Sequence, residues 1–178
     1  MTDNEESLRN RPEGVVHLGS VSIGGKGPGT YLGGVFKLRG NLEEDLLSSA
    51  VSFLKAADRC LNGNQLQDSV ETLVVPGAVC AALSCELFLK YIVFKETGQP
   101  PKGHQLVTLF RECSPESQSA LSDHVPGIQA VLERNNAHFV DGRYHHEREQ
   151  FSFRQSELLQ AAESLSGFVS KRFREGVA

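Results

Sequence analysis

The sequence has few features of a membrane or secreted protein. Its 178 residues contain no uninterrupted apolar run close to the roughly 20 residues of a membrane span. The N-terminal segment MTDNEESLRNRPEG is polar and acidic, which is not the composition of a secretory signal. The four cysteines include no C-x-x-C pair, so buried free thiols are favoured over a metal or redox site. We therefore predict a cytoplasmic protein with no membrane segment.

An excess of positive charge is also lacking. The chain has 18 Lys and Arg residues against 22 Asp and Glu, a formal net charge of −4. The surface as a whole therefore does not attract nucleic acid, although a local basic site is compatible with this balance. A hydrophobic content of 39% and a charged content of 22% are ordinary for a soluble globular protein. This length and composition predict one domain with a sizeable core.

Glycine is concentrated in residues 1–40, which hold nine of the 17 glycines. The segment GGKGPGT is rich in glycine but lacks the spacing of a phosphate-binding P-loop, because Gly27 follows Lys26 where Ser or Thr is required. We predict a flexible arm over residues 1–40, in which VVHLGSVSI and TYLGGVFKLR form at most a weak hairpin. Residues 41–178 are then the folded domain.

The pattern after residue 40 is helical throughout. Asn41 is a candidate N-cap, and Pro76 suits the first turn of a second helix whose apolar residues face all directions. A helix of that kind is covered on every side by its neighbours. The absence of sustained alternation predicts an all-α bundle of about five helices. The expected long helices are residues 41–62, 76–97 and 152–173. Between the last two we expect a short helix from residue 104 and another from residue 115. The latter breaks at Pro126-Gly127, and the helical pattern resumes over IQAVLERNN.

Three motifs in this order resemble HEPN domains. Glu86 and Lys90 form a Glu-x-x-x-Lys pair on the central helix, and TGQPPKGHQLVTLF after it is similar to G-x-x-x-x-x-H-x-L-x-x-L. Downstream, FVDGRYHHE is similar to F-x-x-W-R-Y-x-x-E, with Gly142 in the place of Trp. The resemblance covers about residues 41–173. It implies a small all-α domain that is often dimeric, from a family of metal-independent ribonucleases and inactive relatives. It also implies an RNA or nucleotide phosphate ligand in a defence or toxin-type setting.

The ribonuclease signature of that family is Arg, four to six residues, then His on a late helix. Arg134-Asn135 is similar to its start, and His138 follows after three residues, one fewer than the signature has. Residues four apart share a helix face, so Arg134 and His138 would project together if the helix reaches His138. Cleavage of RNA without a metal needs a base, a cation for the phosphoryl oxygens and an acid. We predict Arg134, His138, Glu86 and Lys90 as catalytic residues, with no cofactor and no metal.

Further phosphate or RNA contacts are predicted at Asn135, Arg143 and Tyr144. An equally weighted alternative is that Arg143 and Tyr144 anchor their segment to the bundle through Glu86. The site hypothesis requires Arg134, His138 and Arg143 to converge on Glu86 in one cleft.

Structural roles can also explain several of these groups. Glu86 and Lys90 can be a structural ion pair, which on a central helix needs good partners because of its desolvation cost. His104 is expected to cap its helix or to bond a nearby carbonyl rather than act in catalysis. We expect His145, His146 and Glu147 to be solvent-exposed residues that lead into the last helix. A zinc site of His138, Asp141, His145 and His146 has no standard ligand spacing.

Two functions therefore stay open at this stage. The first is a metal-independent endoribonuclease acting on single-stranded RNA, as a homodimer that brings two sets of residues together. The second is a non-catalytic module that binds a partner protein, through residues 1–40, or a phosphorylated small ligand. A purely structural subunit of a larger assembly is a third possibility.

Overall fold

The computed structural model describes residues 41–65, 70–136 and 155–174. All of them belong to one unit, residues 39–178. The predicted arm lies outside the described residues, so the boundary at residue 40 stays a prediction. The described residues form six helices, and the predicted all-α fold is confirmed. They are α2 (Leu42–Leu61), α3 (Val74–Thr97), α4 (Leu106–Glu112), α5 (Pro115–His124), α6 (Ile128–Arg134) and α8 (Gln155–Phe173).

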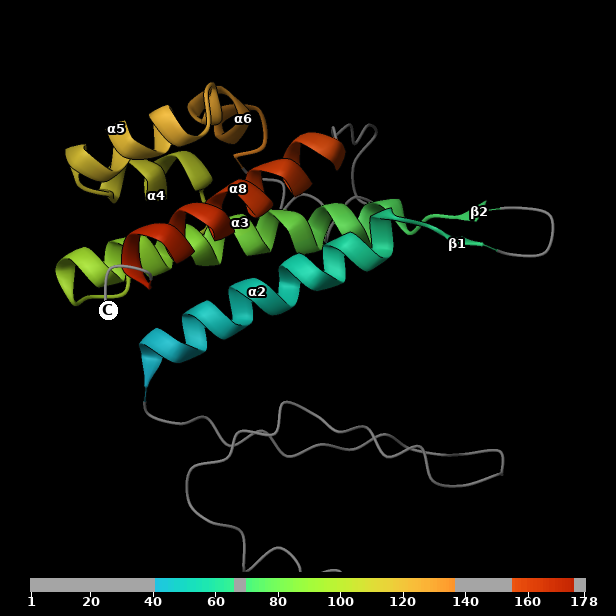
Figure 1. The fold of residues 1–178 in the computed structure, drawn as a ribbon, viewed down its shortest axis with the longest axis horizontal. Coiled ribbons are helices and arrows are strands. Elements are labelled where there is room, and N and C mark those ends of the chain that lie inside the picture. Colours follow the sequence, from blue (N-terminus) through green and yellow to red (C-terminus); the bar gives the residue numbers. More distant parts are fainter. Residues whose placement is uncertain (1–40, 66–69, 137–154, 175–178) are drawn as a thin grey trace, which may run out of the picture. The chain divides into compact units, whose positions relative to one another are not determined.

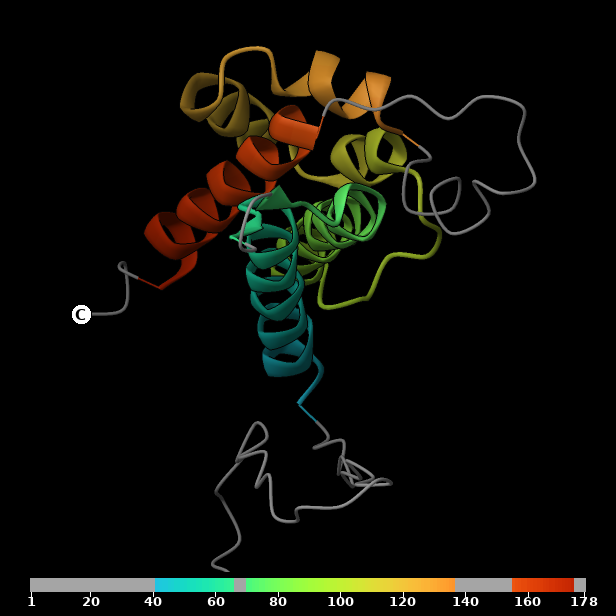
Figure 2. The same ribbon diagram turned by 90° about the vertical axis from the view of Figure 1, so that its right-hand side faces the viewer.

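Helix α3 is the centre of the bundle. In Figures 1 and 2 it lies between α2 on one side and the layer of α4, α5 and α6 on the other, with α8 packed along it. Its buried side chains cover most of its circumference, but Cys80, Leu83, Leu87, Lys90 and Phe94 form a stripe that is only partly buried, so the predicted cover on every side is incomplete. The helix ends at Gly98, whose φ of 71° is the left-handed conformation that glycine adopts without strain.

Helices α2 and α3 form an antiparallel pair around a short link. Two-residue strands β1 (Asn64–Gln65) and β2 (Val70–Glu71) pair antiparallel between them. Gly77 lets the helices approach closely, because a Cβ there would lie 2.6 Å from the Leu61 side chain. The expected cap at Asn41 was wrong in its mechanism, since that side chain makes no capping hydrogen bond. Asn41 is nevertheless the N-cap residue, and its main-chain oxygen accepts the N–H of Asp45 at 3.1 Å, the first regular hydrogen bond of α2.

The start of α5 is fixed by two side chains. The hydroxyl of Ser114 accepts the N–H of Ser117 at 3.2 Å, which is the predicted cap before Pro115. Glu96, on the last turns of α3, accepts the N–H of Ser114 at 2.7 Å and its hydroxyl at 2.8 Å. The Ser117 hydroxyl also donates to Glu96. A carboxylate of the central helix therefore binds the positive end of α5.

All four cysteines are free, as predicted, but only two are buried. Cys85 and Cys113 lie in the core, whereas Cys60 and Cys80 are partly exposed. Burial raises the pKa of the Cys85 thiol to about 12. Burial, together with the charges of Glu96 and Glu112, raises the pKa of Cys113 to about 12. The two core thiols are therefore held in their protonated form.

Among the described helices, α3 has the length and apolar character that a membrane span requires. Within its most apolar 18-residue window, 67% is buried inside the fold. The charged side chains of Glu86 and Lys90 lie in the middle of this helix. Burial by neighbouring helices is what the core helix of a globular domain shows.

Candidate functional site

Glu86 is a buried carboxylate in the middle of α3. Its side chain is 2% exposed, and its Oε1 accepts a hydrogen bond from Nζ of Lys90 at 2.8 Å. Lys90, one turn later, has a side chain that is 15% exposed. The predicted pairing of these two residues is thus confirmed. Because the opposite charges are both largely removed from water, each needs the other to offset its desolvation.

His104 completes this cluster from the loop that precedes α4. Its Nδ1 lies 2.9 Å from Oε1 of Glu86, the same oxygen that Lys90 contacts. The residue at the N-cap of α4 is Gln105, so the predicted capping by His104 was wrong, and its predicted bond to a carbonyl stays a prediction. The buried carboxylate attracts the imidazole because ionised oxygens are the stronger acceptors. An ionised carboxylate only accepts hydrogen bonds, so this contact places the ring hydrogen on Nδ1.

The second oxygen of Glu86 is in a different situation. Oε2 is buried, and no hydrogen-bond donor reaches it within the described part of the chain. A buried acceptor without a donor costs about 1–3 kcal/mol, and such groups are few in native proteins. Oε2 is thus the atom of this cluster to which a further donor can bind.

The end of α6 meets the start of α4 beside this cluster. The side-chain oxygen of Asn136 accepts the N–H of Val107 at 2.9 Å, and its main-chain oxygen accepts the N–H of Leu106 at 3.3 Å. Asn136 thus supplies the N-terminal cap of a helix that begins 30 residues earlier in the chain. This residue was not among those predicted for the site, and its only local signal is an amide after the last turn of α6. The contact brings the end of α6 to within two residues of His104.

Arg134 lies on the last turn of α6, with a side chain that is 49% exposed. Its Nε and Nη2 both lie 3.3 Å from Oε2 of Glu157, in the first turn of α8. In the described residues Arg134 is thus paired with Glu157 and not with Glu86. The next residue, Asn135, is buried, and its amide donates to the main-chain oxygen of Val131 at 2.7 Å. That amide stabilises the end of its own helix, and its role toward phosphate stays a prediction.

The other predicted site residues lie outside the described residues. These are His138, Arg143 and Tyr144, together with Asp141, His145 and His146 of the zinc alternative. Their convergence on Glu86 therefore stays a prediction. Within residues 41–65, 70–136 and 155–174, no three His, Cys, Asp or Glu side chains gather closely enough to hold a metal ion.

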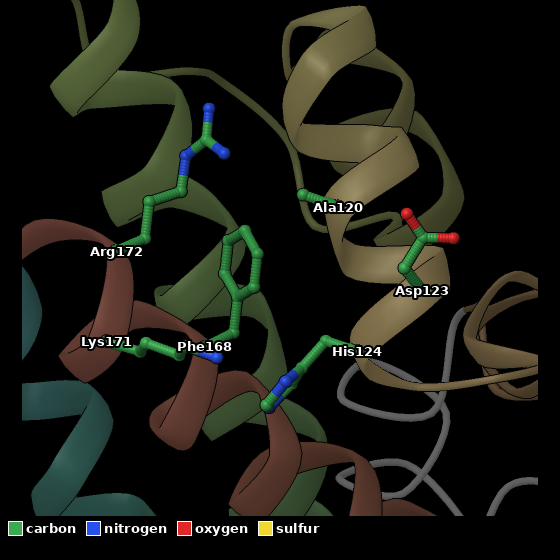
Figure 3. A pocket seen from close by; sticks show the side chains of 6 residues that line it. All are labelled: Ala120, Asp123, His124, Phe168, Lys171 and Arg172. Atoms are coloured by element: carbon green, nitrogen blue, oxygen red, sulfur yellow. The ribbon is translucent and has the colours of Figure 1, made fainter.

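A separate open hollow of about 530 Å³ lies between α5 and α8. Figure 3 shows Phe168 between Arg172 of α8 and His124 of α5. The guanidinium of Arg172 is 5.8 Å from the centre of the Phe168 ring, and the His124 ring is 6.0 Å from it. Phe168 follows Glu157 by 11 residues, about 16 Å along a helix. The lining residues, none of them predicted for the site, are Ala120, Asp123, His124, Phe168, Lys171 and Arg172.

One comparison with known proteins gives a match. Residues 43–172 match the family model described as the HEPN domain. The match covers most of the chain and all the described helices, apart from Leu42 at the start of α2 and Phe173 at the end of α8. No curated protein and no solved structure matches the chain.

Proposed function

We propose that this chain, which belongs to the HEPN domain family, is a metal-independent endoribonuclease acting on single-stranded RNA. The observation that carries the proposal is the contact of Asn136 with the first turn of α4. It joins the helix that bears Arg134 to the loop that bears His104. The end of α6, which bears Arg134, is thereby held at the start of α4, and His104 before that helix contacts Glu86 beside Lys90.

In this proposal each step of RNA cleavage has its own group. Arginine suits the phosphoryl oxygens because its planar guanidinium can donate to two of them. Arg134 takes this role, and Arg143, Lys90 and Tyr144 add contacts to the same or a neighbouring nucleotide. His138, two residues after Asn136, transfers a proton. The net charge of −4 favours a substrate held by few phosphate contacts, which suits a single strand better than a long duplex.

The pairing of Arg134 with Glu157 is compatible with this role. Both nitrogen contacts are made to one carboxylate oxygen at 3.3 Å, at a side chain that is about half exposed. An exposed ion pair contributes roughly 0–1 kcal/mol, so a phosphate can replace Glu157 at small cost. The pair then keeps the guanidinium in place until the substrate arrives.

The test is cleavage of a labelled single-stranded RNA in the presence of EDTA. We expect the wild type to cleave and the Arg134→Ala/His138→Ala double variant to lose activity by at least about 100-fold. The matched control is Lys55→Ala/Arg59→Ala, which removes two basic residues from exposed positions on α2. Equal cleavage by the wild type and the first double variant would rule out the proposed site.

A non-catalytic HEPN module is the second candidate. The observation that favours it is that Arg134 already has a carboxylate partner, while His138 follows it at one residue less than the ribonuclease signature. Such a module would bind a phosphorylated small ligand, or a partner protein through residues 1–40. It predicts no cleavage of RNA, together with protection of residues 1–40 from proteolysis when the partner is present. If residues 1–40 are cleaved at an unchanged rate in the presence of every candidate partner, the binding of a partner protein through this segment is contradicted.

The setting follows from the family resemblance. We propose a cytoplasmic homodimer of a defence or toxin-type system, in which two copies bring their sites together. Light scattering coupled to size-exclusion chromatography tests the dimer directly, since the chain has a mass of 19.5 kDa. A single species at the monomer mass across micromolar concentrations would contradict it.

A further inference from the structure

We propose that the hollow between α5 and α8 is a second phosphate-binding subsite, which holds the RNA strand a few nucleotides away from Arg134. The proposal rests on the proposed function, because it assigns a place to a part of the strand that is not cleaved. Its basis is the lining of the hollow, in which Lys171 and Arg172 of α8 lie opposite His124 of α5. These three residues belong to helices that the structure describes.

The charge of the lining favours an anion. Lys171 and Arg172 are positive, and Asp123 alone is negative. His124 supplies a hydrogen-bond donor in either protonation state of its ring. Within the described ranges neither Lys171 nor Arg172 forms an ion pair with a carboxylate, whereas Arg134 does. A chain with a formal net charge of −4 therefore presents here two cations that no carboxylate neutralises.

The guanidinium of Arg172 is held in place by aromatic rings. It lies 5.8 Å from the centre of the Phe168 ring and 5.8 Å from that of Phe173. The Phe173 ring is itself fixed by an edge contact with the buried Tyr91, at 5.9 Å between centroids. A cation–π contact uses the charge of the guanidinium and not its N–H donors. The donors therefore stay available, on a side chain that loses less freedom when a phosphate binds.

The hollow offers no free aromatic surface to a base. Phe168 forms its floor and is only 5% exposed, with Arg172 on one side of the ring and His124 on the other (Figure 3). A base cannot stack on a ring that is covered in this way. The subsite therefore contacts the backbone of the strand, and phosphate contacts carry no sequence information.

The hollow lies along the same side of α8 as the contact of Arg134 with Glu157. Phe168 follows Glu157 by 11 residues, which is three turns and about 20° at about 3.6 residues per turn. Helix α6 packs against α8 near Glu157, and α5 packs against it near Phe168. The separation of about 16 Å corresponds to about five phosphates of a stacked strand at about 3.4 Å each. A strand bound at Arg134 can therefore place another phosphate at Lys171 and Arg172.

A structural role accounts for only part of this arrangement. Basic residues are common in the last turn of a helix because the helix dipole favours them there, and Lys171 and Arg172 occupy that turn of α8. The dipole does not require them to line a hollow with a histidine from another helix. It also does not require the guanidinium to lie against two rings.

The experiment measures binding of a fluorescent strand of about 12 nucleotides by anisotropy. The strand is fully 2′-O-methylated, so it has no free 2′-hydroxyl and is not cleaved. We expect Lys171→Gln/Arg172→Gln to raise Kd about 10-fold at about 0.1 M salt, equally for oligo(A) and oligo(U). The slope of log Kd against log salt should fall by about 1.4, or about 0.7 for each lost contact. The matched control is Lys55→Gln/Arg59→Gln, which removes two exposed cations from α2 and should change Kd little.

Gly167 allows a second test that removes none of the lining residues. It is exposed on α8, and the one described side-chain atom within 4 Å of a Cβ placed there is Nε2 of His124, at an ordinary contact distance of 3.6 Å. Gly167→Glu puts a carboxylate at the edge of the hollow, and Gly167→Gln is its neutral counterpart. We expect the glutamate to raise Kd by about 3-fold more than the glutamine does, the effect of one exposed charge. Equal Kd values for the two variants would contradict an anion in the hollow.

The remaining outcomes separate the subsite from the proposed function. Binding by Lys171→Gln/Arg172→Gln as tight as by its control overturns the subsite and leaves the ribonuclease proposal standing. A wild type that binds the strand through the hollow but cleaves no RNA overturns the ribonuclease proposal alone. If AMP or polyglutamate displaces the strand as effectively as unlabelled strand does, the hollow holds a free phosphorylated ligand or an acidic protein instead, and the assignment to RNA is wrong.

Discussion

Asn136 closes the N-terminus of α4 from the end of α6, with its side-chain oxygen 2.9 Å from the backbone nitrogen of Val107. The two residues are 29 positions apart in the chain. The first N–H groups of a helix have no partner within the helix, so an outside acceptor is needed there. Here the acceptor comes from the segment that leads directly into residues 137–154. One hydrogen bond therefore stabilises a helix and also fixes where the candidate catalytic segment begins.

Replacement of Asn136 by alanine should lower the stability of the fold. We expect Asn136→Ala to lower the free energy of unfolding by about 1–2 kcal/mol, the usual cost of a lost cap. Asn136→Asp keeps an acceptor at the same position and should lose much less. Urea denaturation followed by circular dichroism measures the free energy of unfolding of both variants. Equal stability of the alanine variant and the wild type would show that the cap contributes nothing.

The sequence predicted those parts of the fold whose signals are local. The central position of α3 followed from apolar residues on all its faces, and the start of α5 from Ser114 before Pro115. The pairing of Glu86 with Lys90 followed from their spacing of four residues. Each of these depends on neighbours within one or two helical turns.

Contacts between distant residues were not predictable in the same way. The partner of His104 lies 18 positions away, and no local pattern distinguishes a histidine that caps a helix from one that meets a buried carboxylate. The pairing of Arg134 with Glu157, 23 positions later, depends on how α6 packs against α8. The expected cap at Asn41 failed for a related reason, because a favourable residue type does not fix the direction of its side chain.

Removal of Glu86 should be among the most damaging single changes to the core. Glu86→Ala leaves the ammonium of Lys90, whose side chain is 15% exposed, without its counter-charge. Breaking a buried pair in this way costs about 3–5 kcal/mol. The double variant Glu86→Leu/Lys90→Met replaces both charges by apolar groups and should recover most of that loss. Urea denaturation of the two variants tests this, and a double variant less stable than Glu86→Ala would contradict the argument.

The pair of Arg134 and Glu157 should contribute little to stability. Their side chains are 49% and 22% exposed, and the contacts are 3.3 Å long. A double-mutant cycle with Arg134→Ala and Glu157→Ala should give a coupling below about 1 kcal/mol, decreasing with added salt. Loss of RNA cleavage in Arg134→Ala would then reflect loss of function rather than unfolding. A coupling above about 2 kcal/mol would instead make Arg134 a structural residue.

The cysteines should differ in reactivity according to their burial. Thiolates, not thiols, react with iodoacetamide. With pKa values raised to about 12, Cys85 and Cys113 have a thiolate fraction of only about one in 10⁴ at pH 8. Cys60 and Cys80 are partly exposed, so mass spectrometry of the native protein should find label there first. Labelling in concentrated urea is the control, and there all four should react.

Alkaline pH should weaken the fold through the same two core thiols. Each has a folded-state pKa above the ordinary value of 9.0, so the folded state binds more protons than the unfolded chain between these values. The stabilisation is complete below about pH 9 and is lost as the pH rises toward 12. A Cys85→Ala/Cys113→Ala variant is less stable at pH 7 but should lose less additional stability between pH 8.5 and pH 10.5. Parallel losses in variant and wild type over that range would show that these thiols do not cause the alkaline destabilisation.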